Sequence, residues 1–265
     1  MIQTLPVGEP VWGVTSLDNR LYVLRGNKSS EQIEVYDIDS YRLLRALSVP
    51  GLGAKTDIVA CGHNRCAYIS DYTHQSVHRI ALSDATVACW PVNDPPIRLS
   101  LTYRHGVLVS CGKVRRIKEF TTYGQLLHVL TLPWGMLPWH AIQLSSGQFL
   151  VCVGHPSDQL HRVCLIGSDG SVVKSFGGPP GSGSQQMSGP AHMAVDRNDF
   201  AFVVDQNNCR VLLLSPVLAH VRDVLSLSWR PQRVHLDSDR GRLYVADNEF
   251  KDEKFTAGQV FVVNV

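Results

Sequence analysis

Short apolar runs that end at equivalent positions recur along the whole chain. They end at residues 25, 71, 111, 153, 205 and 247, so that successive ends are 46, 40, 42, 52 and 42 residues apart. Each run is a stretch of about five mainly aliphatic and aromatic residues, which is typical of a short buried strand. A repeat of roughly 40–50 residues that contains only short strands is the signature of a propeller blade. The pattern therefore predicts an all-β fold, a six-bladed β-propeller.

The fifth repeat shows how each blade divides into four strands. Its strand-like stretches lie at 193–196, 200–205, 210–214 and 220–225, and polar or proline-containing turns separate them. No segment of the chain keeps a 3.6-residue apolar period, so we expect almost no helix. Each repeat is therefore interpreted as a four-stranded antiparallel blade.

The repeats also predict how the ring closes. We interpret residues 1–265 as a single propeller with blades at approximately 11–53, 54–94, 95–137, 138–187, 188–229 and 230–265. The last repeat has only three strand-like stretches, whereas residues 1–7 form an additional one before the first blade. We expect this closing strand to complete the last blade, because the pairing protects a sheet edge that would otherwise stay open.

Composition narrows the possible partners. The chain is 44% hydrophobic, and its 25 Lys and Arg residues nearly balance 23 Asp and Glu residues. This balance gives no general reason to expect a nucleic acid or a membrane as partner. The sequence contains no apolar stretch of membrane-spanning length, and its first residues do not have the pattern of a signal peptide. Most of the seven Cys residues lie within strands, which favours reduced thiols and a cytoplasmic protein.

The fifth repeat carries a recognisable motif. A glycine-rich linker follows Phe-Gly, a Pro precedes the first strand, Val-Asp ends it, an Asp closes the second strand, and Asn-Cys-Arg-Val opens the third. These positions are Phe176, Gly177, Pro190, Val195, Asp196, Asp205, Asn208, Cys209, Arg210 and Val211. The motif resembles an NHL repeat. Half of it recurs in the sixth repeat, it is partial in the third and fourth, and it is degenerate in the first two, where Arg25 replaces the usual Asp.

The resemblance implies a range of functions. Similar domains form the C-terminal part of tripartite-motif ubiquitin ligases, where they bind proteins or RNA. The same scaffold also carries a few enzymes, including the lyase that completes peptide amidation. A shared fold does not by itself choose among these functions.

One polar position recurs next to the prolines that begin the blades. The residue two places after the Pro, or its equivalent, can carry charge or bind metal in five of six blades. The set is Trp12, Asp57, Arg98, His140, His192 and Arg233. We expect these side chains to ring the upper mouth of the central channel and to form a binding surface. Capping of strand starts is the alternative.

An enzymatic role would use this ring. His140 and His192 lie on neighbouring blades, and with Asp57 they offer the donors that zinc prefers. The metal histidines of the related lyase directly follow the Pro, however, whereas each His here is one place later. The sequence also has no Gly-x-Ser-x-Gly and no phosphate-binding loop. We therefore expect neither catalysis nor a cofactor, and assign no metal site.

Binding of single-stranded RNA is an alternative, because it requires cations together with aromatic faces. The candidate stacking surfaces are Trp229 and the 134–139 loop. The candidate cations are Arg98, Arg115, Arg116, Lys118, Arg230 and Arg233.

Protein binding requires no special sequence motif, since loops on a rigid propeller commonly carry recognition. The 248–258 loop holds Phe250 and Phe255 among charged residues, and His155 begins a second candidate loop. Apolar anchors within a polar rim are typical of protein interfaces. We therefore predict a non-catalytic interaction module, in which the upper face binds a protein, as in the substrate-recognition part of a ubiquitin ligase-like protein. RNA is the alternative ligand.

Overall fold

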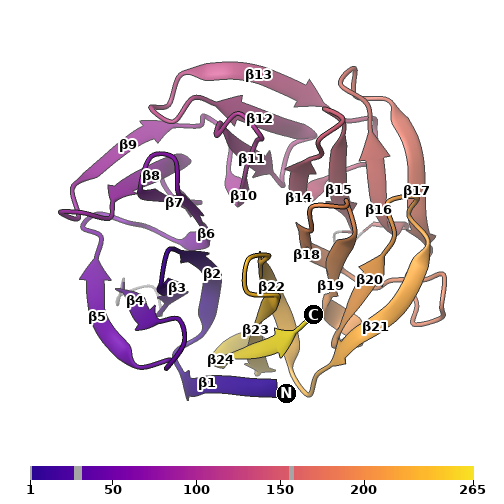
Figure 1. Ribbon diagram of the computed structural model, residues 1–265. Helices are drawn as coiled ribbons and strands as arrows, with labels where there is room; N and C mark the ends of the chain where they lie inside the picture. The colour runs from indigo at the N-terminus through magenta and orange to yellow at the C-terminus, as the bar shows by residue number, and fades with distance from the viewer. Residues whose placement is uncertain (1, 27–31, 155–157) are drawn as a thin grey trace.

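The computed structural model of this chain describes residues 2–26, 32–154 and 158–265 and shows six four-stranded antiparallel sheets arranged in a ring (Figure 1). The predicted six-bladed β-propeller is thereby confirmed. Apart from the single-turn 3-10 helix η1 (Gln206–Asn208), the regular structure in these residues is entirely β.

Within each blade the strands follow one another from the centre of the ring to its rim. Blade 1 contains β2 (Val11–Leu17), β3 (Arg20–Arg25), β4 (Gln32–Asp37) and β5 (Leu43–Ser48). Blade 2 contains β6 (Lys55–Cys61), β7 (Cys66–Asp71), β8 (Ser76–Ala81) and β9 (Val87–Pro91). Blade 3 contains β10 (Pro96–Leu101), β11 (Val107–Cys111), β12 (Arg116–Phe120) and β13 (Leu126–Thr131).

The other three blades repeat this order. Blade 4 contains β14 (Pro138–Gln143), β15 (Phe149–Val153), β16 (His161–Ile166) and β17 (Val172–Gly178). Blade 5 contains β18 (Pro190–Val195), β19 (Ala201–Asp205), β20 (Arg210–Leu214) and β21 (His220–Ser226). Blade 6 contains β22 (Arg230–Asp237), β23 (Arg242–Lys251) and β24 (Lys254–Asn264), and β1 (Ile2–Gly8) is its outermost strand.

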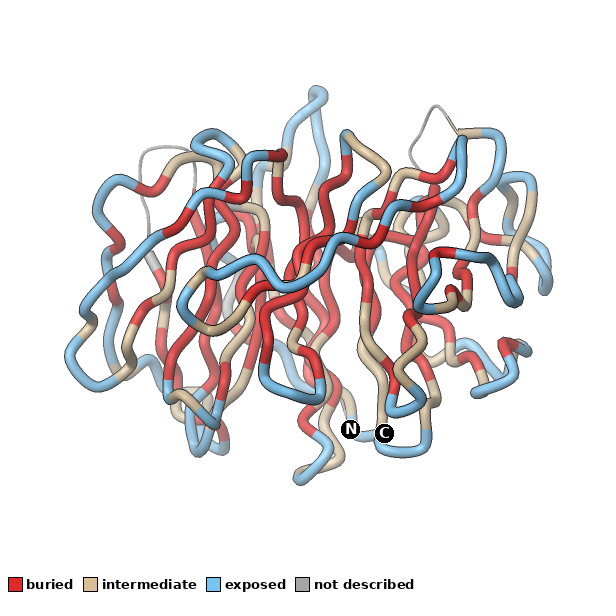
Figure 2. Tube along the Cα trace, turned by 90° about the horizontal axis from the view of Figure 1, so that it is seen from above, coloured by how far each residue is buried: buried red, intermediate tan, exposed pale blue. Residues whose placement is uncertain are grey.

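The N-terminal strand closes the ring as predicted. β1 pairs with β24 antiparallel, with Ile2 opposite Val263 and Leu5 opposite Val260. The side chain of Leu5 is buried in the cluster between blades 6 and 1. The two ends of the chain consequently lie close together on one face of the disc (Figures 1 and 2).

The core is divided among the blade interfaces. Six hydrophobic clusters each fill the space between two neighbouring blades. Because a blade has neighbours on both sides, its second strand is buried on both faces, and every residue of β7, β11, β15 and β19 is buried. Figure 2 shows this buried material between the exposed loops of the two faces.

The upper face is defined here as the one that carries the loops between second and third strands and the links between blades. The Asp residues that end second strands organise it. Asp71 accepts hydrogen bonds from the amides of Gly53 and His74, at 2.8 and 3.0 Å. Asp205 accepts from the Ser188 amide at 2.6 Å. Each carboxylate thereby ties loop backbone to its blade.

Candidate functional site

A β-bulge in the first strand of every blade sets the geometry at the centre of the ring. In all six blades the register with the second strand shifts by one residue, after the first paired position in blades 1 to 5 and after the second in blade 6. Such a bulge bends the strand and re-aims the next side chain. The residues that follow the bulge are Gly13, Asp57, Arg98, His140, His192 and Arg233.

This register corrects the alignment of blade 1. Trp12 lies at the bulged position itself, and Gly13 is the equivalent of Asp57. Pro10 precedes β2, whereas Pro96 is the first residue of β10, so counting from the proline shifts blade 1 by one place. A Cβ atom at Gly13 would lie 2.6 Å from Cγ2 of Ile58 in the next blade, which leaves no space for a side chain there.

The structure brings the other five predicted ring residues together, but inside the disc. We call Asp57, Arg98, His140, His192 and Arg233 the central cluster. Their exposed fractions are 2%, 5%, 1%, 8% and 2%. The prediction that these side chains face solvent at the mouth of a channel is therefore wrong, because they form a buried polar cluster. Charges at such a depth are stable only when they are paired and hydrogen-bonded.

Asp57 is the centre of the cluster. Its Oδ1 lies 3.2 Å from Nε of Arg233, and its Oδ2 lies 3.4 Å from Nε2 of His192. Oδ2 also accepts a hydrogen bond from the Leu99 amide at 3.0 Å. Burial alone would raise the pKa of Asp57, but His192 and Arg233 outweigh it, and the pKa lies below its ordinary value. Asp57 is accordingly a carboxylate at neutral pH.

Arg233 reaches Asp57 across an intervening blade. Arg233 belongs to blade 6 and Asp57 to blade 2, and Gly13 of blade 1 places no side chain between them. The guanidinium also donates to the Gln232 carbonyl at 2.6 Å and to the Thr56 carbonyl. Burial lowers the pKa of Arg233 to about 10, so Arg233 remains a cation at neutral pH.

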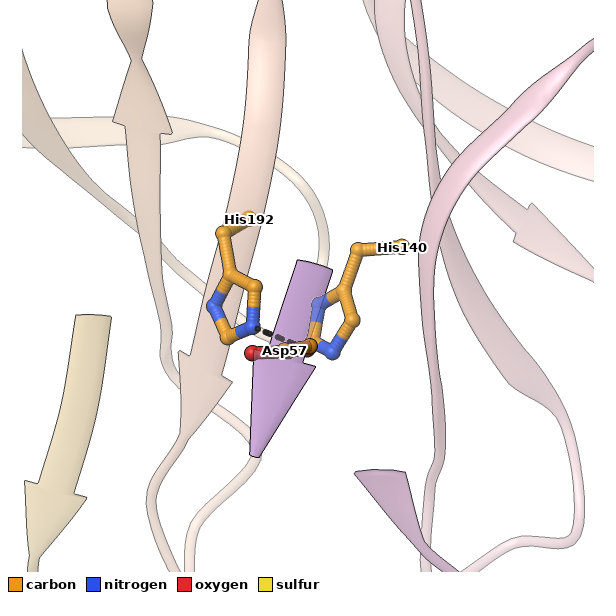
Figure 3. Close-up of side chains that lie close together, drawn as sticks. All are labelled: Asp57, His140 and His192. Carbon is orange, nitrogen blue, oxygen red and sulfur yellow. Dashed lines mark ion pairs between the residues drawn. The ribbon is translucent and has the colours of Figure 1, made fainter. Parts of the chain in front are cut away.

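The two histidines of the cluster stack and are held by backbone (Figure 3). Their ring centroids are 3.8 Å apart with an interplanar angle of 13°. Nδ1 of His140 accepts from the Met193 amide at 3.2 Å, and its Nε2 lies 3.3 Å from the Leu99 carbonyl. Nδ1 of His192 accepts from the Val234 amide at 3.5 Å. These partners assign the hydrogen of each neutral ring to Nε2.

Side chains of the first strands link the six blades into a closed ring of hydrogen bonds. Five of them accept from a backbone amide of the next blade, and Ser100 instead donates to a carbonyl. The contacts are Thr15 Oγ1 with Ala60 N, Asp57 Oδ2 with Leu99 N, Ser100 Oγ with Ala141 O, His140 Nδ1 with Met193 N, His192 Nδ1 with Val234 N, and His235 Nε2 with Ser16 N. The polar residues near the axis therefore stabilise the assembly of the blades.

Asp57, His140 and His192 together offer three potential metal ligands. One donor atom from each lies within 4.8 Å of the others. The hydrogen-bond pattern does not suit a cation, however, because Nδ1 of both rings accepts a backbone N–H and Nε2 therefore carries the hydrogen. A metal needs an unprotonated nitrogen. The buried cation Arg233 adds repulsion, and Asp57 is already engaged by it.

Burial of neutral histidines predicts that stability depends on pH. Burial lowers the pKa of His192 and of His235 to about 4, and that of His140 well below its usual range. The pKa of a histidine in the unfolded chain is about 6.5, so unfolding takes up protons between about pH 4 and pH 6.5. The stability that is present above pH 6.5 is therefore lost as the pH falls toward 4. We expect a loss of about 1–2 kcal/mol for each of His192 and His235 at about pH 5.

Urea unfolding measured across this pH range tests the prediction. The slope of unfolding free energy against pH should decrease in a His192→Gln variant. A slope that is the same in His192→Gln as in the parent would contradict the assignment of His192 as a buried neutral ring.

A groove on the upper face, between blades 3 and 4, presents charged and aromatic side chains to solvent. We call it the blade 3–4 groove; its volume is about 490 Å³. Its lining residues are Lys113, Val114, Arg115, Arg116, Thr131, Trp134, Gly135, Leu137 and Asp158. Trp134 is 87% exposed, and the Arg115 guanidinium lies 4.0 Å from the centroid of its ring. The groove thus combines three cations and one carboxylate with an accessible indole.

The predicted 248–258 loop is instead a β-hairpin, since β23 extends to Lys251 and β24 begins at Lys254. Its two Phe residues form a separate surface above blades 6 and 1. Phe255 packs edge-on against Trp12 at 5.6 Å between centroids, and Phe250 against Phe255 at 5.1 Å. Phe250 remains 38% exposed, and the Arg230 guanidinium lies 4.5 Å from the centroid of its ring. This aromatic group therefore folds partly onto the disc. His155, the remaining loop candidate, lies outside the described residues.

The residues proposed for RNA binding do not form one surface. Arg98 and Arg233 are buried in the central cluster. Lys118 is also buried, with its Nζ 2.7 Å from Asp94 Oδ2 and 2.7 Å from the Val92 carbonyl. Of the six candidate cations, Arg115 and Arg116 line the blade 3–4 groove, and Arg230 lies beside Phe250.

Sequence reasoning missed two features of these sites. Lys113 in the groove carries no repeated signal, although its place between Cys111 and Arg116 locates it in an upper-face loop. Gly13 was not identified because blade 1 was aligned on Pro10. Its signal is that it is a glycine at the position where the other five blades each have a polar residue.

Comparisons with known proteins support the fold. No protein-family model matches this sequence, and no curated protein matches it either. Similar solved structures include virginiamycin B lyase from Staphylococcus aureus, with a TM-score of 0.68, 10% identity and 99% of each chain covered.

A streptogramin B lyase structure has a TM-score of 0.67 and 11% identity, with 97% of this chain and 86% of that chain covered. Hydrazine synthase of Kuenenia stuttgartiensis has a TM-score of 0.67 and 11% identity, with 96% and 95% covered. At this identity the likeness shows the six-bladed fold alone. Within the described residues, no helix has the length and apolar character of a membrane span.

Proposed function

We propose that this propeller is a non-catalytic interaction module whose blade 3–4 groove binds an acidic segment of a protein partner. The observation that carries the proposal is the exposed Trp134, stacked with Arg115 in a groove that Lys113 and Arg116 also line. Aromatic and Arg side chains in a pocket are the usual anchors of protein recognition. The positive lining selects a ligand that carries negative charge.

The distribution of cations favours a protein segment over RNA. A single-stranded nucleic acid needs a positive groove that follows its backbone together with several stacking faces. Here Arg115 stacks on the one exposed indole, Arg116 also pairs with Asp94 at 3.2 Å, and other candidates are buried or lie beside blade 6. A compact site of about 490 Å³ suits a short peptide with one aromatic or aliphatic anchor.

The central cluster supports a non-catalytic role. The imidazole nitrogens and carboxylate oxygens that an enzyme would use are engaged by backbone groups and by Arg233. The NHL resemblance extends the proposal to the substrate-recognition part of a ubiquitin ligase-like protein. The thiols of Cys61, Cys66, Cys111, Cys152 and Cys164 are free and buried, which is compatible with the cytoplasm as its compartment.

Fluorescence anisotropy with two defined probes tests the proposal. The first is a short fluorescein-labelled peptide of Glu and Phe, and the second is a labelled oligouridylate of similar charge. We expect the peptide to bind more tightly than the oligouridylate. Trp134→Ala should weaken peptide binding about tenfold or more, because the indole is the central contact.

The opposite face provides a matched control. Tyr103 is 57% exposed, and the Arg104 guanidinium lies 5.3 Å from its ring centroid, so this pair resembles Trp134 with Arg115. Tyr103→Ala should bind the peptide as the parent does. Equal losses in both variants would show that any Arg–aromatic pair attracts the probe. Tighter binding of the oligouridylate, abolished by Trp134→Ala, would replace the protein proposal with RNA binding.

A further inference from the structure

Arg98 is the member of the central cluster whose charge has no counter-ion of its own. Its guanidinium donates to the carbonyl of Ile97, in the same strand, at 2.9 Å, and its Cζ lies 5.6 Å from the centroid of the Trp139 ring. Its Nε is buried and has no partner among the residues that the structure describes. A guanidinium has five N–H donors and stays charged in proteins, so the one hydrogen bond described for Arg98 uses only part of its capacity.

Arg233 shows what Arg98 lacks. Both follow the bulge of a first strand, in blades 6 and 3, and each donates to the carbonyl of the residue before it. Arg233 also binds the carboxylate of Asp57, which lies two blades further round the ring. The equivalent residue two blades further on from Arg98 is His192, whose ring is neutral. The ring therefore supplies a carboxylate to one of these two buried arginines.

The charges of the central cluster consequently do not balance. Arg98 and Arg233 carry two positive charges, Asp57 carries one negative charge, and His140 and His192 are neutral. Burial and the nearby charge of Arg233 lower the pKa of Arg98 well below its usual range, because both disfavour the cation. Since a buried charge is stable only when it is paired, the cluster is short of one negative charge.

We propose that a small monovalent anion, of the size of chloride, binds beside the guanidinium of Arg98. One negative charge neutralises the cluster, and the anion accepts hydrogen bonds from the remaining N–H groups of Arg98. A divalent anion would instead leave an excess of negative charge next to Asp57. The five residues of the cluster are each at most 8% exposed, which favours a bare ion over a larger organic anion. Water can accept the same hydrogen bonds, but it leaves the charge uncompensated.

The position of Trp139 places this anion site toward the upper face. The link from blade 3 enters β14 at Pro138, so Trp139 lies at the upper end of that strand and His140 lies one residue further down. The guanidinium of Arg98 faces the Trp139 ring and therefore points toward the upper end of β14. Arg98 and His192, at 5% and 8%, are also the most exposed members of the cluster. An anion therefore has its shortest route to Arg98 from the upper face.

Thermal unfolding at constant ionic strength tests the proposal, with sodium chloride exchanged for the gluconate salt of a bulky monovalent anion. A ligand that binds the folded state raises Tm with its concentration, so we expect the Tm of the parent to rise by about 3 °C or more between about 1 and about 300 mM chloride. Arg98→Met should abolish this rise. In gluconate the variant should melt at or above the parent, because the unpaired buried cation is gone.

Arg104→Met is the matched control. Arg104 is an exposed arginine whose Cζ lies 5.3 Å from the centroid of the Tyr103 ring, and its variant should keep the chloride dependence of the parent. The line width of the chloride NMR signal adds a readout that does not depend on unfolding. The parent should broaden the signal, bromide should reverse the broadening by competition, and Arg98→Met should broaden it less than Arg104→Met does.

Three results would each overturn the proposal. The first is a parent whose Tm is the same in chloride and in gluconate, which would show that water satisfies Arg98. The second is an Arg98→Met variant that keeps the chloride dependence. The third is equal loss of that dependence in Arg104→Met, which would show that chloride acts on exposed cations.

Discussion

Replacement of Asp57 by Ala is expected to lower the free energy of unfolding by about 3–5 kcal/mol, because it leaves the buried cation Arg233 without its counter-ion. The two side chains are each only 2% exposed, and Nε of Arg233 lies 3.2 Å from Oδ1 of Asp57. The substitution also removes the acceptor for the Leu99 amide and the partner of His192. In a chain of this size, the loss corresponds to a fall of about 10 °C or more in Tm.

Two further variants make the result specific. Asp84→Ala removes an exposed carboxylate that bonds only its own turn at Thr86, and should cost less than about 1 kcal/mol. Asp57→Ala combined with Arg233→Met should recover part of the loss, because the Arg233 cation is then no longer buried without its counter-ion. If Asp57→Ala melts like Asp84→Ala, the central cluster does not stabilise the ring.

Deletion of residues 1–7 is expected to lower the free energy of unfolding by at least about 5 kcal/mol, since it removes a buried leucine and exposes the outer edge of β24 in the last blade. Leu5 is 1% exposed and packs with Tyr244 and Val260 between blades 6 and 1. Without β1, the outward-facing backbone groups of β24 lose their partners. Tm should fall by about 10 °C or more.

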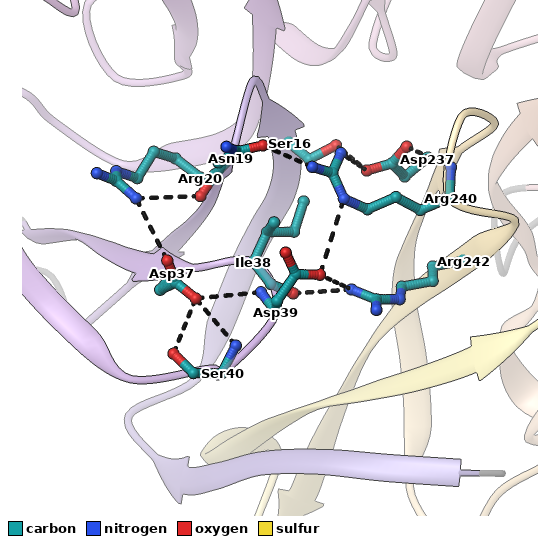
Figure 4. Close-up of polar contacts among 10 residues, drawn as sticks. All are labelled: Ser16, Asn19, Arg20, Asp37, Ile38, Asp39, Ser40, Asp237, Arg240 and Arg242. Carbon is teal, nitrogen blue, oxygen red and sulfur yellow. Dashed lines mark hydrogen bonds and ion pairs between the residues drawn. The ribbon is translucent and has the colours of Figure 1, made fainter.

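The polar contacts of the lower face across this seam do not replace β1. On the lower face, Arg242 donates to the Ile38 carbonyl and to Asp39, both at 2.9 Å, and Arg240 donates to Asn19 at 2.7 Å (Figure 4). These groups are partly or largely exposed, and ion pairs in water contribute little. Thr4→Ala, an exposed change in the same strand, serves as control and should leave Tm unchanged. A truncated protein that melts with the parent would refute this closure.

The fold was predictable because repeated apolar runs, separated by polar turns, can be recognised in a single sequence. Six apolar runs at intervals of 40 to 52 residues determine the number of blades, and a last repeat with three strands predicts that the N-terminal strand closes it. The bulge at the start of each first strand leaves no such signal. It is visible only in the pairing register, which also shows that Pro10 lies one place before β2 and that Gly13, not Trp12, is the equivalent of Asp57.

The candidate sites were predictable in part. Equivalent positions in the repeat identified Asp57, His140 and His192, which the structure brings together. Their burial could not be derived, because it depends on Arg233 reaching across the side-chain-free Gly13 to a blade two places away. The stacking of Arg115 on Trp134 likewise requires the three-dimensional course of two loops, although both residues had been singled out as RNA-binding candidates.

In this proposal the buried cluster stabilises the ring, whereas the blade 3–4 groove binds the ligand. The most direct test is the affinity of the labelled Glu/Phe peptide for His192→Gln and for Trp134→Ala, measured at a temperature at which both are folded. We predict that His192→Gln binds as the parent does and that Trp134→Ala loses about tenfold or more. Loss of binding in His192→Gln with parental affinity in Trp134→Ala would contradict the account and return the site to the centre of the ring.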